Sequence, residues 1–543
     1  MKDLRRCSGV WCRVPGGGAE YSLFRRKFRL NAAAELRILV SADSRYQLYL
    51  DGTLLGRGPV RGDLEHYHFE QYRRRLPEGE HLLCAEVLHW RDEMLAPWSE
   101  VHYSAAFLLL GECGEVELSS GKEWKCLADA SRSSRRWSEA WSENSVIPVG
   151  PMEEYDASRS PGRWKESGYE DSSWLVPESL ARPCFPELCR ADPPSRWKLR
   201  ESGIPQMRSE KIRIASVLSG KDDSVRISSD GVFQAALPAG RRTVLLDLGR
   251  YYTHVFRFRG IGGRGRVRIA YGEALFKNGE KSADRGPVPG GRIGGKGYAD
   301  RILRAGGETA FSPFWYRSGR YVELEFELTE GGSVELSFEF LAYPLNLRAE
   351  WRSPEDPVLE RIFETAWHTA RCCAHEHYED CPYWEQMQYA GDTRIQALIS
   401  YIGSGDGRLG RQAIRQFDES RIGGGLPMSR CPSNFRQIIP AFSLFWIMMI
   451  DDYYSFFGDA EVIREHWSGI RAVLDFFENH REESGLIGPV EGWNFSDWVP
   501  GWPEGRSNRG EALPETLLNL LYAECCRLAD SFAAVVPGGE ERG

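Results

Sequence analysis

The chain has 543 residues, 42% of them hydrophobic and 12% aromatic, and this length predicts about three or four domains with several buried cores. A formal net charge of -9 and a pI near 5.8 argue against nucleic acid as a partner, because phosphate backbones are bound by an excess of Lys and Arg. The 13 cysteines include no CxxC pair, so reduced thiols in a cytoplasmic protein are expected.

Neither a signal peptide nor a membrane span is predicted. The start of the sequence carries basic residues but no apolar run of seven before its glycines. The longest apolar run, residues 441–450, is half the length needed to cross a bilayer and is followed by Asp451 and Asp452. We therefore expect a cytoplasmic protein that does not use a membrane as a partner.

Residues from about 20 to 345 alternate between apolar and polar positions in short stretches such as "AELRILVSADSRYQLYLDG". Gly, Asp or Pro separates these stretches, which is typical of half-buried antiparallel strands and their turns. The Pro-rich, charged segment 182–210 shows neither strand nor helix periodicity and is interpreted as a linker. The sequence thus predicts two antiparallel, jelly-roll-like β-sandwich domains, over residues 1–195 and 205–348.

After Pro344 the apolar residues recur at intervals of three and four, which predicts a helical domain over residues 349–543. Ser353 is the expected N-cap of its first helix. Residues 438–457 are apolar on nearly every face, so this helix should be surrounded by others. Six long helices are expected, near 354–376, 392–404, 406–420, 441–457, 460–481 and 514–532.

The segment "EDCPYWEQMQYAGDTRIQAL", residues 379–398, concentrates acids and aromatic rings before a predicted helix. Glycoside hydrolysis needs one protonated carboxyl group and a second carboxylate, while aromatic faces hold the sugar. Pro382 would make the loop rigid, Gly391 would permit a close approach, and Asp392 would cap a helix from Thr393 onward. A helix cap beside ordinary surface acids remains the alternative. The candidate residues of this segment are Asp380, Trp384, Glu385, Tyr389 and Asp392.

A second aromatic and acidic segment, "EGWNFSDWVPGW" at 491–502, lies between two predicted helices. Trp493, Asp497 and Trp498 could grip the hydroxyls and the apolar face of a sugar, or the tryptophans could simply pin the loop. Two such loops in one helical domain favour a shared cleft. His375 and His377 form an HxH pair without a third ligand, which predicts packed or surface residues rather than a metal site.

The segment "DCPYWEQMQYAGDTRIQ" resembles the signature of the α-L-rhamnosidases, which combine Asp-Cys-Pro, a Glu five residues after the Asp, and Gly-Asp eleven and twelve residues after it. Further along, "IIPAFSLFWIMMIDDYYSFFGD" and "WNFSDWVPGW" resemble the same family in the same order. Upstream, "YEDSSW", "VLLDLGRYYTHVFRFRG", "YGEAL" and "FSPFWYRSGRYVELEFE" resemble its sugar-binding-like and sandwich domains. The resemblance extends over nearly the whole chain.

This resemblance implies β-sandwich domains followed by an (α/α)6 barrel that hydrolyses terminal α-L-rhamnosides with inversion, with a rhamnose-containing glycoside as the partner. Glu385 would be the general acid, and Asp380 and Asp392 would hold the rhamnose hydroxyls. Trp384 stands where the family often has Arg. No cofactor or metal is expected, although calcium in a sandwich domain is left open. The remaining expected substrate-binding residues are Trp384, Tyr389, Trp493, Asp497 and Trp498.

Residues 349–543 hold only about half of the twelve helices of such a barrel. The resemblance implies a later Glu as the general base, and no segment of this chain matches it. A C-terminally truncated enzyme is therefore expected, with doubtful activity and with exposed apolar surface that favours homo-oligomers. Two alternatives stay open, namely a carbohydrate-binding or inactive relative, and another inverting glycosidase on the same fold.

Overall fold

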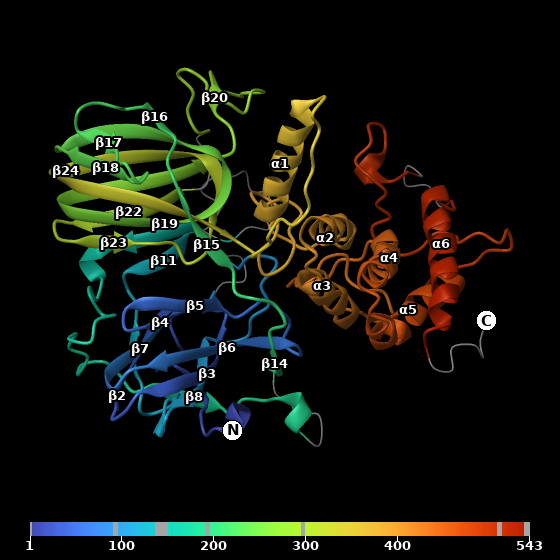
Figure 1. Ribbon diagram of the computed structural model, residues 1–543, viewed down its shortest axis with the longest axis horizontal. Helices are drawn as coiled ribbons and strands as arrows, with labels where there is room; N and C mark the ends of the chain where they lie inside the picture. Colours follow the sequence, from blue (N-terminus) through green and yellow to red (C-terminus); the bar gives the residue numbers. More distant parts are fainter. Residues whose placement is uncertain are drawn as a thin grey trace. The chain divides into compact units, whose positions relative to one another are not determined.

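The computed structural model describes residues 3–90, 96–135, 150, 152–189, 196–294, 299–507 and 513–536. The chain divides into two compact units, shown in Figure 1. The β unit comprises Met1–Ser202 and Gln206–Ala342, and the helical unit comprises Gly203–Pro205 and Tyr343–Gly543. β-sheets followed by a domain with six α-helices confirm the expected fold class.

The first sandwich of the β unit consists of a seven-stranded and a five-stranded sheet. The first sheet has the order β13 (Glu178–Ala181), β1 (Trp11–Arg13), β8 (Ala106–Cys113), β3 (Ala34–Asp43), β6 (Tyr67–Leu76) and β14 (Leu199–Glu201), with β9 (Val116–Glu117) beside β8. The second has the order β10 (Lys125–Ala128), β2 (Tyr21–Leu30), β7 (Gly79–Leu88), β4 (Arg45–Leu50) and β5 (Thr53–Gly58).

The alternation seen in the sequence places one face of each sheet in a shared core. Ile38 and Val40 of β3 pack in one buried cluster with Ala85 and Val87 of β7. Across the two sheets, the rings of Phe24 and Phe107 stack with their centroids 4.9 Å apart. Burial of such side chains contributes about 1.5–3 kcal/mol each, so this shared apolar layer holds the sheets face to face.

A ten-stranded sheet forms the second part of the β unit. Its two long strands bend, so that Val244 and Ile269 of one strand both pair with Leu324 of the other. Its main order is β11 (Arg132–Arg135), β12 (Met152–Asp156), β22 (Ala299–Ala305), β19 (Gly240–Gly272), β24 (Arg317–Ala342), β18 (Phe233–Leu237) and β17 (Val225–Ile227). β15 (Arg208–Ile212), β16 (Ser216–Ser219) and β23 (Thr309–Phe311) pair at its sides, and β20 (Phe276–Lys277) pairs with β21 (Glu280–Lys281).

Two segments pair across the expected domain boundaries. β11 and β12 lie within residues 1–195, yet β12 runs parallel to β22 of the ten-stranded sheet. Within the 182–210 segment, interpreted as a linker, Leu199–Glu201 pairs with β6 of the first sandwich. The boundaries at 195, 205 and 348 stay predictions.

The helical unit contains six α-helices among its described residues, coloured from yellow to red in Figure 1. None of the described helices combines the length and the hydropathy that a membrane span requires. The helices are α1 (Pro357–Cys372), α2 (Ala390–Ser404), α3 (Arg408–Glu419), α4 (Pro440–Phe457), α5 (Glu461–Glu478) and α6 (Thr516–Ala533).

The expected central position of the apolar helix is confirmed, because α4 contacts α2, α3, α5 and α6. Trp446 and Ile447 of α4 are fully buried, and the Trp446 indole N–H donates to the carbonyl oxygen of Ile414 at 2.9 Å. In contrast, Ile395 and Ile402 on α2 are 56% and 64% exposed. The helical unit thus has a dense core around α4 and an apolar face on α2 that its described residues leave open.

Both expected N-caps are wrong. Asp356, not Ser353, caps α1, and its carboxylate accepts from the backbone N–H of Val358 at 2.9 Å because Pro357 starts the helix. Asp392 lies inside the first turn of α2, which begins at Ala390. The N–H of Ala390 donates to the carbonyl oxygen of Ser429 at 3.0 Å. This bond gives the first N–H of the helix a partner, so α2 starts two residues before Asp392, the expected cap.

Candidate active site

The loop between α1 and α2 folds back on itself and brings the predicted acids together. The backbone N–H of Asp380 donates to the carbonyl oxygen of Met387 at 2.9 Å, and that of Cys381 donates to the carbonyl oxygen of Glu385 at 3.2 Å. The Gln386 side-chain amide donates to the carbonyl oxygen of Pro382 at 3.1 Å and closes the same turn. Asp380 and Glu385 therefore stand at the two ends of one short, hydrogen-bonded loop.

Buried amide side chains hold this loop against the helices beneath it. The side-chain amide of Gln388, which is fully buried, donates to the Gln416 side chain at 2.9 Å and to the carbonyl oxygen of Cys431 at 2.6 Å. The Gln396 amide on α2 donates to the carbonyl oxygen of Glu379 at 2.7 Å. These bonds pair buried carbonyl groups on both sides of the loop and keep the acids in fixed positions.

The carboxyl groups in this loop perturb one another strongly. Burial, the charges of Asp392 and Glu385, and a hydrogen bond with Glu385 raise the pKa of Asp380 to about 8. Burial, followed by the charges of Glu385 and Asp497, also raises the pKa of Asp392. The carboxyl group of Asp380 therefore stays largely protonated at neutral pH, and a raised pKa of this kind is typical of neighbouring carboxyl groups in catalytic sites.

The second predicted segment forms an aromatic loop, residues 493–505, next to these acids. The rings of Trp493 and Trp498 both contact Phe495, with centroid distances of 4.9 and 5.2 Å. The Trp493 indole N–H donates to the carbonyl oxygen of Glu504 at 2.9 Å. Trp498 is 70% exposed, so this loop is pinned by hydrogen bonds and still offers an open aromatic face.

The two loops meet through Phe442 at the start of α4. The Phe442 ring lies 6.3 Å from the ring of Tyr389 on one side and 6.3 Å from that of Phe495 on the other. A Cβ atom at position 391 would come within 3.0 Å of the Phe442 ring, which confirms that Gly391 permits a close approach. Together with the electrostatic link between Asp497 and Asp392, these contacts assign both loops to one site.

Arg430, Phe442 and Phe495 also belong to this cluster, although the sequence did not identify them as candidates. The Arg430 guanidinium donates to the Tyr389 hydroxyl at 2.9 Å, and the charges of Asp380 and Glu385 also act on that hydroxyl. Arg430 therefore supplies a cation beside the acids, but its segment "MSRCPSN" contains no pattern that would have revealed it. Phe495 could have been found, because it lies between two residues of the aromatic segment that were selected.

Trp384 packs edge-on against Tyr383, with the ring centroids 4.5 Å apart, and is half-buried. Its expected contact with substrate stays a prediction. His375 and His377 are fully buried, and the Nδ1 atom of His375 lies 3.1 Å from the Glu379 carboxylate, as expected for packed residues. Among the described residues, one group of three potential metal ligands converges, and it lies in the β unit rather than at this site.

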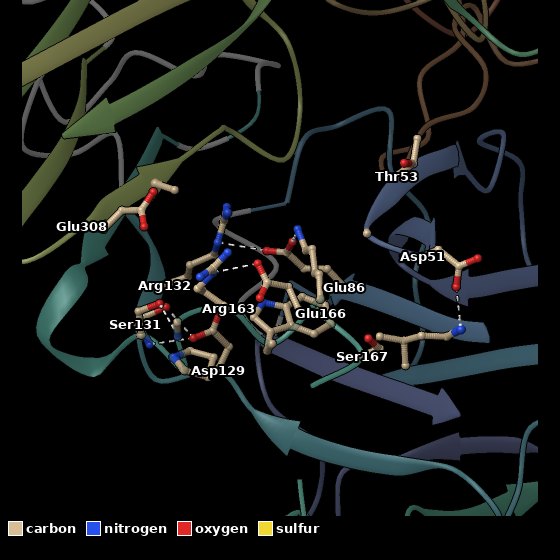
Figure 2. Close-up of a pocket in the computed structure, with 18 of the residues that line it drawn as sticks. Asp51, Thr53, Glu86, Asp129, Ser131, Arg132, Arg163, Glu166, Ser167 and Glu308 are labelled. Carbon is tan, nitrogen blue, oxygen red and sulfur yellow. Dashed lines mark hydrogen bonds and ion pairs between the residues drawn. The ribbon is translucent and has the colours of Figure 1, made fainter. Parts of the chain in front are cut away.

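A polar cavity of about 1060 Å³ also occurs in the β unit (Figure 2). Charged residues line it, but several are already paired: Arg132 lies 3.0 Å from Glu86, and Arg163 lies 2.7 Å from Glu166. The dashed lines in Figure 2 mark such pairs among its lining residues. We therefore regard the perturbed carboxyl cluster of the helical unit as the candidate active site.

Residues 348–542 match the model of the bacterial alpha-L-rhamnosidase 6 hairpin glycosidase domain, which confirms the resemblance noted from the sequence. No curated protein sequence matches the chain.

Solved structures match over nearly the whole chain. A GH78 family rhamnosidase of Bacillus sp. GL1 is 16% identical with a TM-score of 0.81, and the match covers 97% of this chain and 74% of that one. The rhamnosidase of Aspergillus terreus is 17% identical with a TM-score of 0.68, covering 97% and 58%. That of Streptomyces avermitilis, solved with L-rhamnose, is 17% identical with a TM-score of 0.67, covering 95% and 46%. At these identities the matches show a shared fold, and the chain spans about half the length of the last two.

Proposed function

We propose that the chain carries the site that hydrolyses terminal α-L-rhamnosides, as the match of residues 348–542 to the bacterial alpha-L-rhamnosidase 6 hairpin glycosidase domain suggests. The observation that carries this proposal is the raised pKa of Asp380, about 8, beside the exposed Glu385, because glycoside cleavage requires a proton held on a carboxyl group near neutral pH. The rhamnose complex of the Streptomyces avermitilis relative supports rhamnose as the sugar.

In this proposal Glu385 is the general acid. Glu385 is solvent-exposed, so its carboxyl group can reach the glycosidic oxygen of a bound substrate, whereas Asp380 is partly buried. Asp380, protonated at neutral pH because of its raised pKa, would transfer its proton to Glu385, which would donate it to the leaving group, and Asp380 would be left ionised. Proton donation of this kind contributes about a hundredfold to ten-thousandfold in rate.

The other residues of the site are proposed to bind the sugar. Asp392 and Asp497 would accept hydrogen bonds from rhamnose hydroxyls, since carboxylates are strong acceptors. Trp498 offers an exposed ring to the apolar face of the sugar, and Trp493 supports that ring at a centroid distance of 6.0 Å. Tyr389 would be oriented by its hydrogen bond from Arg430. Trp384 is proposed to influence which substrate is accepted.

Hydrolysis with inversion requires a second carboxylate that activates water on the opposite face of the sugar. The distance between that base and Glu385 would be about 6.5–9.5 Å, which leaves room for the water.

The test is release of nitrophenol from a panel of aryl glycosides that includes the α-L-rhamnoside, combined with calorimetric titration of L-rhamnose. Proton NMR of the first product would show the β anomer of rhamnose if the reaction inverts the configuration. Hydrolysis of a different sugar would replace the proposal with another inverting glycosidase. Rhamnose binding without any hydrolysis would leave a carbohydrate-binding relative, and neither activity in folded protein would contradict the proposal.

A further inference from the structure

Asp43, His89 and His102 converge at one end of the first sandwich, far from the acids of the helical unit in sequence. Asp43 ends β3 of one sheet, and His89 follows β7 of the other sheet directly. His102 belongs to the segment that precedes β8. One potential ligand atom from each residue lies within 4.8 Å of the other two. The three residues are thus brought together by the fold rather than by a local sequence motif.

The two carboxylate oxygens of Asp43, which is fully buried, have different partners. The Oδ2 atom accepts from the backbone N–H groups of Tyr103 and Ser104 at 2.7 and 3.0 Å, and from the indole N–H of Trp197 at 2.9 Å. These bonds fix the carboxylate and also fix the segment that carries His102. The Oδ1 atom accepts from the Ser44 hydroxyl at 3.3 Å and lies 3.2 Å from Nδ1 of His89, so it is turned towards the imidazole side of the cluster.

The spacing of Asp43 and His89 suits two ligands of one transition-metal ion. Two ligands at the usual zinc distances of about 2.0–2.1 Å and at a tetrahedral angle are about 3.3 Å apart, close to the 3.2 Å between Asp43 Oδ1 and His89 Nδ1. The rings of His89 and His102 are nearly perpendicular, at 88°, with centroids 5.4 Å apart, so two imidazoles can approach one ion without stacking.

The described cation nearest to Asp43 in sequence is neutralised by its own partner. Arg45, two residues after Asp43, is buried and forms an ion pair with the buried Glu100, so its charge is balanced locally. His89 is buried while His102 is partly exposed, which leaves a route from solvent to the cluster. Hydrogen bonds to the remote oxygen of a ligating carboxylate are the usual outer support of metal sites.

We propose that Asp43, His89 and His102 bind a divalent transition-metal ion of the zinc type, which clamps the β3–β4 corner, the end of β7 and the segment before β8. Two imidazoles and one carboxylate favour zinc over calcium, because calcium prefers oxygen ligands. Three protein ligands leave a position of a tetrahedral ion for a further ligand. The role of the ion is structural, because its three ligands come from three separate segments that the ion would tie together.

The experiment is zinc binding by the full chain after the purification tag has been removed, with the cysteines kept reduced by a phosphine. Calorimetric titration with zinc alone, and metal content after dialysis, would be compared between the wild-type chain and the His102→Ala and His102→Gln variants. His66→Ala is the matched control, because His66 is also paired with an aspartate, its Nδ1 atom 3.0 Å from Asp63, but lies outside the cluster.

We expect the wild-type and control chains to bind one zinc equivalent more than the His102 variants, whose affinity at this site should fall by more than about a hundredfold. Zinc should raise the melting temperature of the wild-type chain by about 3 °C or more, and that of the His102 variants by less. Equal zinc content and equal melting shifts in the wild-type and His102 variants would overturn the proposal. Calcium binding at the cluster in place of zinc would also overturn it.

Discussion

The carboxyl groups of Asp380 and Glu385 are joined by a hydrogen bond at the entrance to α2, and this bond contributes to a pKa of about 8 for Asp380. The relationship depends on a loop whose backbone bonds to itself, and on buried glutamines that hold the loop in place. Asp380 therefore retains a proton near neutral pH without a histidine beside it. Its pKa is set mainly by burial and by the like charges of the neighbouring carboxylates.

Replacing Asp380 with Asn should stabilise the helical unit at neutral and alkaline pH. The pKa of an unfolded aspartate is about 3.9, so the folded chain binds more protons than the unfolded chain between about pH 4 and 8, and its stability falls as the pH rises through that window. For the wild-type chain we expect the free energy of unfolding to fall by about 1–2 kcal/mol from pH 5 to pH 8, a value reduced because Asp380 is partly exposed. The Asp380→Asn variant lacks this loss.

Denaturant unfolding at these two pH values, followed by tryptophan fluorescence, would measure the effect. The Asp380→Asn variant should show a flatter dependence on pH than the wild-type chain. Asp530→Asn, at an exposed position of α6, is the control and should keep the wild-type dependence. Identical pH dependence in the wild-type and Asp380→Asn chains would contradict the raised pKa.

Much of the helical unit could be predicted from the sequence. The repeat of apolar residues placed all six helices to within a few residues, and the uniformly apolar segment 438–457 correctly predicted a central helix. These features are local, because the spacing of apolar residues within one helix identifies the face that it buries. The errors occurred where partners distant in sequence decide the outcome, as at Ala390, whose N–H is bonded to Ser429.

In the candidate site, too, local features could be predicted and contacts between distant residues could not. The acids and tryptophans could be selected because their residue types match a known chemistry and lie in two short segments. Arg430 and Phe442 could not be selected, since each reaches the site by contacts with Tyr389 that only the folded chain creates. In the β unit, the parallel pairing of Glu154 with Arg301 likewise could not be predicted, because the alternation within a strand indicates its buried face but not the strand with which it pairs.

The Trp498→Ala change should weaken sugar binding without destabilising the chain. Trp498 is 70% exposed, so its removal should change the melting temperature by less than about 1 °C. Loss of its ring as a sugar platform should weaken L-rhamnose binding about tenfold. Trp446→Ala is the contrasting control, because this fully buried ring on α4 should cost about 3–5 kcal/mol in the free energy of unfolding. Unchanged rhamnose affinity in Trp498→Ala would exclude that ring from the site.

The Gly505→Ala change should disrupt the aromatic loop through a steric clash. Gly505 has a φ of 72°, and a Cβ atom there would lie 2.5 Å from the Phe495 ring. Gly501 has a φ of 88° but no atom within 4 Å of the corresponding position, so Gly501→Ala introduces the backbone strain alone.

Thermal unfolding and rhamnose titration of the two variants would separate these effects. We expect Gly505→Ala to be less stable than Gly501→Ala by about 1–3 kcal/mol and to bind rhamnose more weakly. Gly501→Ala should keep its affinity for rhamnose. Equal stability and equal affinity in the two variants would show that the position of the Phe495 ring is not critical.

The most direct test of the proposed role of Glu385 compares two rhamnosides that differ only in their leaving groups. A nitrophenolate departs without much help from an acid, whereas an alkoxide needs a proton. For the Glu385→Gln variant we predict a fall in kcat of about a hundredfold to ten-thousandfold on the alkyl rhamnoside and a much smaller fall on the nitrophenyl rhamnoside. Glu461→Gln, which removes an exposed carboxylate paired with Arg464, should leave both rates unchanged. Equal losses on the two substrates, or no loss on either, would contradict Glu385 as the general acid.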